Sequence, residues 1–412
     1  MNDIQLNTPF ILKNGITIKN RFIKSATSEQ LGDRKRNPRP ALAKAYERWA
    51  NGGVGIAITG NIMIDRTALG EPKNVVLDEK SDLKNFRQWT KKGTQHGTHL
   101  WAQLNHPGKQ SPVTLSRAPV APSAIPLEMN MKGAFAKPKA LTEHEIYGLI
   151  EKFARSARLA KEVGFTGVQI HAAHGYLISQ FHSSKHNQRT DKWGGSIENR
   201  MRFVHEVYRA VRAEVGNKFP VAVKLNSGDF IHGGFTEDES MVVAKSLSDA
   251  GIDLIEISGG TYESQAMIDP SEAPMKASTK KREAYFLHYA ESVRQKVDTP
   301  LAVTGGFRSA RGMKGAIQSD ATDFVGLARP MMLYPDLPTV AGQNEDSTFD
   351  IKRPTTGFRA LDVAMMVDLA WWEEQIHLMG KGKEPNVNFS AWAAVINNFF
   401  RMGSAAFKPR RA

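Results

Sequence analysis

Residues 221–258, VAVKLNSGDFIHGGFTEDESMVVAKSLSDAGIDLIEIS, contain two short apolar runs with an amphipathic segment between them. Val221–Leu225 and Leu254–Ser258 are nearly continuous aliphatic runs, as in parallel strands that are covered on both faces. Glu237–Ala250 has helical periodicity, and Thr236 stands three residues before Glu239, which is the spacing of a capping box. The stretch therefore predicts a strand, a helix and a second parallel strand.

The same alternation extends along most of the chain. Six further runs predict strands: Arg21–Lys24, Val54–Thr59, Thr98–Leu104, Gly167–His171, Leu301–Thr304 and Asp323–Leu327. Helical periodicity recurs in Glu143–Val163, Ile197–Val215, Tyr285–Val297 and Ala310–Gln318. Eight strands alternating with helices favour an α/β (β/α)₈ barrel, or TIM barrel, over an open doubly wound sheet. We expect this barrel to occupy residues 1–342.

Residues 343–412 are predicted to form a linker and a helical C-terminal extension. The polar stretch Gln343–Thr356 is followed by two apolar-rich segments, Ala360–Met379 and Phe389–Met402. The first segment contains Trp371 and Trp372, and the second contains Trp392, Phe399 and Phe400. We expect them to pack on the barrel or on a partner subunit, which would make a homo-oligomer, rather than on a membrane.

Composition excludes several classes of protein. The 412-residue chain has no cysteine, so disulfides, thiolate metal sites and cysteine-ligated iron–sulfur clusters are excluded. Its net charge is +13, but the basic residues are scattered and accompany no nucleic-acid-binding motif, so we expect no nucleic-acid partner. Neither a targeting segment nor a long apolar run is evident, which predicts a soluble cytoplasmic protein without membrane insertion.

The fourth predicted strand ends in a group of polar rings. His171, His174 and Tyr176 fall within six residues, and functional residues of such barrels follow the carboxyl ends of the strands. Imidazole N–H groups can donate to a carbonyl or nitro oxygen, and a tyrosine hydroxyl can deliver a proton. The spacing of the two histidines also occurs in metal sites and in structural histidines, so the motif alone leaves these readings open.

Other strand ends carry residues suited to a flavin and its phosphate. Small residues, an amide and a cation would suit the pyrimidine edge of a flavin; they are Ser25, Ala26, Thr27, Gly60, Gln103 and Lys224. The loops after the seventh and eighth strands of such barrels commonly bind phosphate. Here those loops contain Gly305, Gly306, Ala328 and Arg329.

These residues lie in longer motifs, and the chain resembles the Old Yellow Enzyme family of NAD(P)H:flavin oxidoreductases over about residues 5–340. The resemblance is carried by Asn20-Arg21-Phe22, by Gln103-Leu104-Asn105-His106-Pro107-Gly108 and by residues 171–200, HAAHGYLISQFHSSKHNQRTDKWGGSIENR. It implies FMN as cofactor and NADPH or NADH as hydride donor.

The resemblance also implies individual roles. His171 and His174 would bind the electron-withdrawing oxygen of the substrate, and Tyr176 would protonate its α-carbon. Gln103, Lys224, Gly60 and Ser25 to Thr27 would contact the isoalloxazine ring, while Gly306, Ala328 and Arg329 would hold the phosphate. Three positions depart from the family pattern: lysine replaces the usual arginine at Lys224, alanine replaces glycine at Ala328, and His182-Ser183-Ser184 replaces Leu-Ser-Pro.

The sequence therefore predicts an FMN-dependent oxidoreductase that reduces an activated alkene, either an α,β-unsaturated carbonyl compound or a nitroalkene. Two alternatives from other classes remain at this point. One is a metal-dependent barrel hydrolase that uses His171 and His174, and the other is a flavin-binding protein without turnover.

Overall fold

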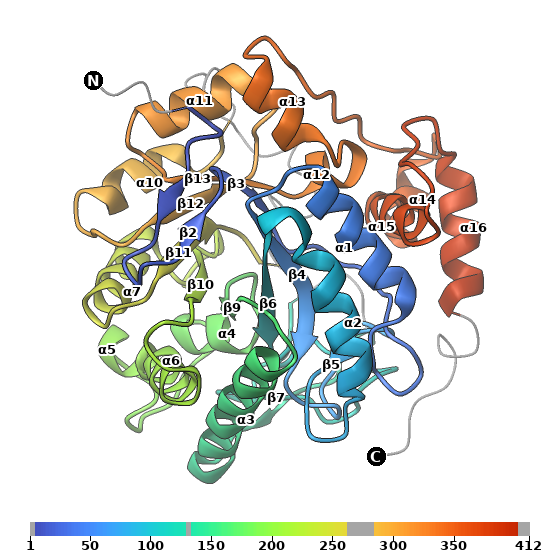
Figure 1. The fold of residues 1–412 in the computed structure, drawn as a ribbon. Coiled ribbons are helices and arrows are strands. Elements are labelled where there is room, and N and C mark those ends of the chain that lie inside the picture. The colour runs from blue at the N-terminus through green and yellow to red at the C-terminus, as the bar shows by residue number, and fades with distance from the viewer. Residues whose placement is uncertain (1–4, 129–132, 262–283, 403–412) are drawn as a thin grey trace.

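The computed structural model describes residues 5–128, 133–261 and 284–402. Within these ranges, eight parallel strands close into a barrel, because β3 pairs with β13 on one side and with β4 on the other (Figure 1). Around the barrel the strands are β3 (Phe22–Lys24), β4 (Ile56–Met63), β6 (His99–Asn105), β9 (Gly167–Ala172), β10 (Val221–Asn226), β11 (Leu254–Ser258), β12 (Leu301–Thr304) and β13 (Phe324–Leu327). The eight predicted strands and the predicted barrel are confirmed.

Helices surround the barrel (Figure 1). They are α1 (Pro40–Asn51), α2 (Leu83–Gly93), α3 (Glu143–Glu162), α4 (Leu177–His182), α5 (Ile197–Arg200), α6 (Arg202–Val215), α7 (Glu237–Asp249), α10 (Leu287–Arg294), α11 (Ala310–Gln318), α12 (Arg329–Leu333) and α13 (Leu337–Gln343). The capping box predicted before α7 is present, with Thr236 Oγ1 accepting from the Glu239 N–H at 3.2 Å. The helix predicted over Ile197–Val215 is divided into α5 and α6 at Met201.

Strand β4 differs from its predicted length. The sequence predicts an end at Thr59, but the strand continues to Met63 and its register with β6 shifts between Ile58 and Asn61. Such a bulge inserts extra backbone and redirects the strand. Gly60 therefore lies within β4, at the irregularity, and not after the strand as predicted.

Apolar residues fill the half of the barrel interior near the amino-terminal ends of the strands. A hairpin of β1 (Phe10–Ile11) and β2 (Thr17–Ile18) precedes the first barrel strand. Its residues Leu12 and Ile18 form one buried cluster with residues from the strands, including Ile23, Ile56 and Trp101. Polar interior residues are thereby left to the carboxyl half of the barrel, where the predicted site lies. Three shorter strands, β5 (Val75–Val76), β7 (Val120–Ala121) and β8 (Lys139–Ala140), lie outside the ring.

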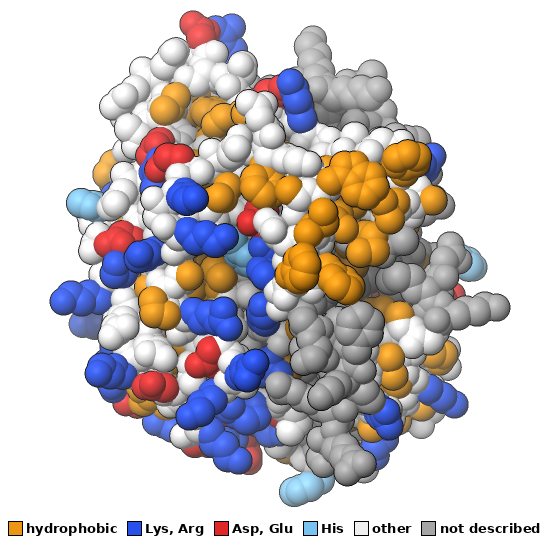
Figure 2. All heavy atoms as spheres, turned by 90° about the vertical axis from the view of Figure 1, so that its right-hand side faces the viewer, with side chains coloured by type: hydrophobic (Ala, Val, Ile, Leu, Met, Phe, Trp, Pro, Cys, Tyr) orange, Lys and Arg blue, Asp and Glu red, His pale blue; other side chains and the backbone are white. Residues whose placement is uncertain are grey.

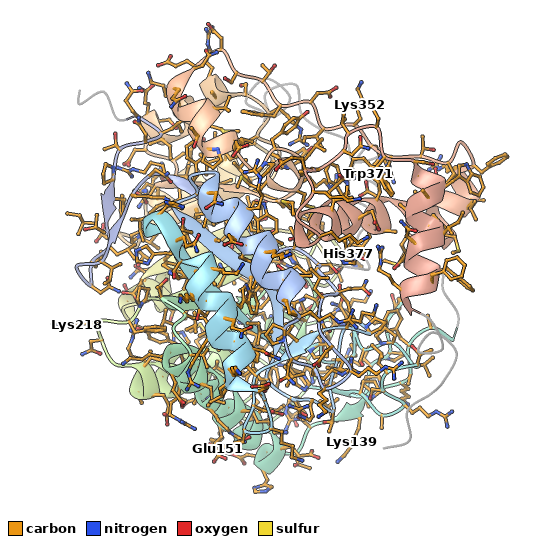
Figure 3. The ribbon with its side chains drawn as sticks, turned by 45° about the vertical axis from the view of Figure 1, so that its right-hand side comes forward. Lys139, Glu151, Lys218, Lys352, Trp371 and His377 are labelled. Carbon is orange, nitrogen blue, oxygen red and sulfur yellow. The ribbon has the colours of Figure 1, made fainter. Side chains whose placement is uncertain are left out.

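The C-terminal extension is helical, as predicted. It contains α14 (Arg359–Ala364), α15 (Val367–Gly380) and α16 (Ala391–Met402), of which α15 packs on α1 and α12. Trp371 and Trp372 on α15 are buried and belong to the same apolar core as the barrel helices. Trp371 is labelled in Figure 3. On α16, Trp392, Phe399 and Phe400 remain 45%, 49% and 76% exposed, on a face where apolar side chains gather (Figure 2). Helix α15 therefore packs on the barrel helices, whereas the outer face of α16 is exposed and its packing on a partner subunit stays a prediction.

No helix among the described residues is long and apolar enough to cross a membrane.

Candidate active site

The structure brings His171, His174 and Tyr176 together at the carboxyl end of β9. The ring centres of His171 and Tyr176 are 4.8 Å apart, and those of His171 and His174 are 5.2 Å apart. His171 and Tyr176 are buried, with 3% and 6% of their surfaces exposed. The three polar rings thus lie together in a largely buried environment, where a hydrogen bond to a bound molecule is stronger than in water.

Both histidines are neutral at neutral pH. Burial, together with the nearby His174 and Lys224, holds the pKa of His171 well below its usual range, and burial lowers the pKa of His174 to about 3. The Ala173 N–H donates to His171 Nδ1 at 3.2 Å, so the ring proton of His171 resides on Nε2. His171 Nε2–H is therefore a hydrogen-bond donor that carries no net charge.

Three hydrogen bonds fix the position of His174. Its φ of +60° lies in the left-handed region, which residues other than glycine seldom adopt. Asn226 Oδ1 accepts from the His174 N–H at 3.0 Å, and Gln110 Nε2 donates to the His174 carbonyl at 3.0 Å. The ring Nε2 and Ser258 Oγ share a hydrogen bond of 2.8 Å. These three hydrogen bonds come from the end of β10, the loop after β6 and the end of β11, and they hold the strained backbone in one conformation.

The Tyr176 hydroxyl accepts a hydrogen bond of 3.3 Å from Asn61 Nδ2, on the irregular part of β4. The bulge therefore brings Asn61 to the end of β9. A donor on the phenol oxygen favours the phenolate over the phenol, which assists the loss of the hydroxyl proton.

A chain of hydrogen bonds crosses the barrel beneath this cluster. Gln103 Nε2 donates to Gln169 Oε1 at 2.7 Å, and Gln169 Nε2 donates to Glu256 Oε2 at 2.6 Å. From the other side, Lys224 Nζ lies 2.9 Å from Glu256 Oε1, and Thr304 Oγ1 donates to the same oxygen at 2.6 Å. Since the Thr304 proton is used there, the 2.8 Å bond between Ser25 and Thr304 is donated by Ser25.

Every bond of this network points toward the Glu256 carboxylate, which is fully buried. Burial alone would raise the pKa of Glu256, but Lys224 and the bonds from Thr304 and Gln169 outweigh burial and lower the pKa below its usual value. The carboxylate is therefore ionised, and its partners present their other polar atoms elsewhere. The predicted flavin residues Ser25, Gln103 and Lys224 thus belong to one connected set.

Sequence reasoning did not identify Gln169, Glu256 or Asn226 as parts of the site. The available signal was a single polar residue inside an otherwise apolar strand, as in Leu254-Ile255-Glu256-Ile257-Ser258. In the barrel, Glu256 is the register partner of Lys224, and Lys224 is the register partner of His171. Polar residues at matching heights on adjacent strands therefore face one another.

Gly60 and the loop after β3 are in direct contact. A side chain on Gly60 would place its Cβ 2.5 Å from the Thr27 carbonyl oxygen and 2.9 Å from the Glu29 carboxylate, so only glycine fits. Glu29 Oε1 accepts from the Gly60 N–H at 3.0 Å and from the Tyr46 hydroxyl, and lies 3.6 Å from the ammonium of buried Lys24. Thr27 and Gly60 therefore pack directly against each other, and their shared role at the flavin stays a prediction.

The predicted phosphate residues have suitable backbone conformations. Gly305 and Gly306 have φ values of +118° and +98°, which leave their backbone accessible without a side chain. Ala328 has a φ of −97°, so alanine is accommodated at this departure from the family pattern. Arg329 is 41% exposed at its side chain and pairs with Asp368 of α15 at 3.0 Å.

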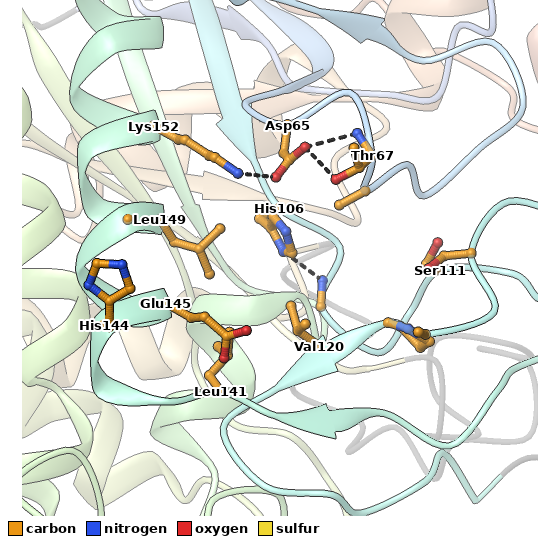
Figure 4. A pocket seen from close by; sticks show the side chains of 16 residues that line it. Asp65, Thr67, His106, Ser111, Val120, Leu141, His144, Glu145, Leu149 and Lys152 are labelled. Carbon is orange, nitrogen blue, oxygen red and sulfur yellow. Dashed lines mark hydrogen bonds and ion pairs between the residues drawn. The ribbon is translucent and has the colours of Figure 1, made fainter. Parts of the chain in front are cut away.

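A separate polar cavity of about 300 Å³ lies between the end of β6 and α3 (Figure 4). Lys152 and Asp65 form an ion pair of 2.5 Å in its wall, and burial lowers the pKa of the neighbouring His106 to about 4. None of the residues predicted to bind flavin or substrate lines this cavity.

The part of the chain described by the structure contains no group of three or more histidine, aspartate or glutamate side chains able to hold a metal ion. His171 and His174 have no third ligand there.

A closed (β/α)₈ barrel with its polar cluster at the carboxyl ends of the strands is the architecture of a barrel enzyme. The family model of the NADH:flavin oxidoreductase / NADH oxidase family matches residues 5–347. The chain belongs to this family, which is the Old Yellow Enzyme family, and it is an FMN-dependent oxidoreductase that takes electrons from NAD(P)H.

Individual relatives agree. The chain is 37% identical to the NADH-dependent flavin oxidoreductase iliE of Hypocrea jecorina, over 84% of this chain and 91% of the relative. It is 35% identical to the NADH-dependent flavin oxidoreductase iccE of Talaromyces variabilis, over 92% and 99%. The solved old yellow enzyme homologue from Zymomonas mobilis is 26% identical, with a TM-score of 0.70 over 84% of this chain and 95% of that chain.

Proposed function

We propose that this flavoenzyme is an ene-reductase that reduces the carbon–carbon double bond of an α,β-unsaturated carbonyl compound or a nitroalkene. The observation that carries the proposal is the neutral pair His171 and His174 beside the Tyr176 hydroxyl at the end of β9. Neutral imidazole donors polarise an oxygen without forming a salt with it, so a carbonyl or nitro group is favoured over a carboxylate as the oxygen that is bound.

The roles follow from the contacts. His171 Nε2–H and the His174 ring would bind the substrate oxygen and draw electron density from the β-carbon. Tyr176, with its oxygen supported by Asn61, would give its proton to the α-carbon. FMN, reduced by NADH or NADPH, supplies the hydride for the β-carbon.

The residues at the strand ends fit the flavin. Lys224 uses one ammonium N–H for Glu256 and retains two for the N1 and O2 edge of the ring, where reduction places negative charge. Gln103 and Ser25 donate away from the site and keep lone pairs for the ring edge, while Ala26, Thr27 and Gly60 would line it. Gly305, Gly306, Ala328 and Arg329 would hold the phosphate, in a barrel of residues 1–342 with 343–412 as its extension.

Names of relatives support the substrate class. A cinnamate reductase of Clostridium sporogenes is 31% identical over 71% of this chain, although the match spans only 46% of that protein. Cinnamate contains a carbon–carbon double bond conjugated to a carboxyl group, so this name supports the reduction of a conjugated double bond and not the choice of a carbonyl or nitro group as the oxygen that is bound.

The test begins with the absorbance of the purified chain. We expect a yellow protein that NADH or NADPH bleaches without oxygen and that cyclohexenone then recolours, with cyclohexanone as product. A bleached protein that no enone or nitroalkene reoxidises would refute the proposed substrate class. A yellow protein that neither nucleotide bleaches would indicate the non-catalytic flavin binder, and a colourless protein with stoichiometric zinc would indicate the hydrolase.

A further inference from the structure

Helix α15 lies outside residues 5–347, the region that the family model matches, yet it buries an unusual number of polar side chains. Glu373, Glu374, Gln375 and His377 are each at most 5% exposed. Burying a charge has a high desolvation cost unless partners compensate for it, so the partners of these side chains indicate what the helix does.

Glu373 holds the loop that follows β3. Its carboxylate accepts from Ser28 Oγ at 2.6 Å and from Gln30 Nε2 at 2.9 and 3.1 Å. Gln30 has a φ of +47°, a left-handed conformation that a residue other than glycine adopts only when its surroundings hold it there. Glu373 therefore fixes two residues that directly follow the predicted ring-binding residues Ser25, Ala26 and Thr27.

His377 holds the residue between them. Its Nε2 lies 2.8 Å from the Glu29 carbonyl oxygen, and because burial lowers the pKa of His377 to about 3, the ring is neutral and donates this bond. The side chain of Glu29 extends to the Gly60 N–H at 3.0 Å. A continuous series of contacts therefore leads from α15 through Glu29 to the surface formed by Thr27 and Gly60.

A third contact reaches the opposite part of the site. Asp368, in the first turn of α15, lies 3.0 Å from Arg329 Nη2, and its other oxygen accepts from Trp372 Nε1 at 3.1 Å. One helix is thus bonded to both predicted parts of the FMN site, the ring-binding loop and the phosphate-binding arginine. Its place beside α1, with His377 and Trp371 labelled, is visible in Figure 3.

We propose that α15 is a positioning element of the FMN site, in which Glu373 and His377 hold the ring-binding loop Ser25–Gln30 and Asp368 orients Arg329 toward the phosphate. This inference rests on the proposed assignment of the flavin residues. It gives the C-terminal extension a role in cofactor binding that is separate from its contribution to the apolar core.

The chain offers a matched control in the next residue. Glu374 is as buried as Glu373, but its carboxylate bonds Arg401 and Asn397 of α16 rather than the loop. Glu373→Gln keeps one oxygen for Ser28 and Gln30 but places an amide nitrogen against the Gln30 amide in place of the second oxygen. Glu374→Gln makes the same substitution on the same helix away from the site. Comparison of the two variants separates positioning of the cofactor from general stability.

The experiment is FMN titration of the two apoproteins, with the absorption spectrum and reduction potential of the bound flavin and the melting temperature of each apoprotein. We expect Glu373→Gln to weaken FMN binding by about tenfold, the scale of one charged hydrogen bond, and to shift spectrum and potential. Glu374→Gln should change only the melting temperature. Equal effects of both variants on FMN binding, or unchanged binding and spectrum in Glu373→Gln, would overturn the inference.

A second pair of variants tests the His377 contact. His377→Gln retains an N–H donor for the Glu29 carbonyl and should restore the flavin spectrum that His377→Leu alters. Absence of this rescue, with both variants folded, would also contradict the proposal. A wild-type protein that binds FMN but reduces no alkene would refute only the proposed substrate class, since none of these readouts requires turnover.

Discussion

Replacing Tyr176 by phenylalanine separates the two halves of the proposed cycle. The variant retains the ring that packs 4.8 Å from His171 and loses only the hydroxyl. Flavin reduction by NADH needs no proton from this group, so its rate should stay near that of the wild type. Reoxidation by cyclohexenone should slow by about 10²–10⁴-fold, or about 3–5 kcal/mol of barrier, which is the usual effect of removing a positioned acid.

The structural cost of this change is small by comparison. The lost hydroxyl accepts one hydrogen bond from Asn61, and an unsatisfied buried donor costs about 1–3 kcal/mol of folding free energy. Tyr289→Phe is the matched control, because Tyr289 is also buried and its hydroxyl donates to Ser240 at 2.6 Å on the outer helices. The control should lose similar stability and leave both half-reactions unchanged.

Anaerobic stopped-flow absorbance at the flavin bands measures the two half-reactions separately in the FMN-loaded variants. If Tyr176→Phe slowed flavin reduction as much as reoxidation, or slowed neither, the assignment of Tyr176 as proton donor would be wrong. Slow reoxidation in the Tyr289→Phe control as well would show that lost packing, not a lost proton, is responsible.

Three further predictions concern other groups. Lys224→Met should lower the flavin reduction potential, measured by potentiometry, and should destabilise the fold by about 3–5 kcal/mol, because Glu256 would remain buried without its cation. Calorimetry would show whether the double variant Lys224→Met/Glu256→Met recovers the stability, and no recovery would count against the pair. A cavity of about 630 Å³ is lined by four cations, Arg34, Lys35, Arg39 and Lys80, which could bind the 2′-phosphate of NADPH. Replacing Arg34 and Lys35 with glutamine should then raise KM for NADPH and not for NADH, and equal changes for both would exclude a 2′-phosphate site there. The neighbouring Arg36 is buried, bonds the Pro72 carbonyl and does not line this cavity. Burial lowers the pKa of His182 from 6.5 to about 3, so the stability that neutral His182 contributes is full above pH 6.5 and is lost as the pH falls. In urea unfolding, the free energy of unfolding of His182→Phe should therefore rise relative to that of the wild type by about 3 kcal/mol between pH 7 and pH 4. A difference that stays constant with pH would refute this.

The barrel and the cluster of His171, His174 and Tyr176 could be predicted because both depend on residues that are close together in the sequence. Each strand is a contiguous apolar run, and His171, His174 and Tyr176 fall within six residues of one strand end. The end of β4 was predicted wrongly because the bulge at Gly60 depends on pairing with β6, a contact that local propensity does not contain. Even so, Gly60 could be selected from the sequence, since glycine beside a strand end indicates close approach of another backbone.

The contacts of α15 could not be predicted because they join residues about 345 positions apart, such as Ser28 and Glu373. A sequence pattern shows that α15 has apolar residues to bury, and Trp371 and Trp372 are buried accordingly. The pattern does not show where Glu373 and Glu374, the buried acids that follow these tryptophans, find donors.

Those acids also explain why the extension is more than a cover for the barrel. A buried ion pair or carboxylate adds little net stability over an apolar residue of the same size, because desolvation offsets most of the attraction. If α15 served only to cover apolar surface, leucine or methionine at Glu373 would serve as well. The carboxylate is instead bonded to a strained loop, as Glu256 is bonded to Lys224 inside the barrel. In both places a buried carboxyl group fixes one conformation of the groups around it. Lys224 is predicted to contact the flavin, and Ser28 directly follows residues that are predicted to do so.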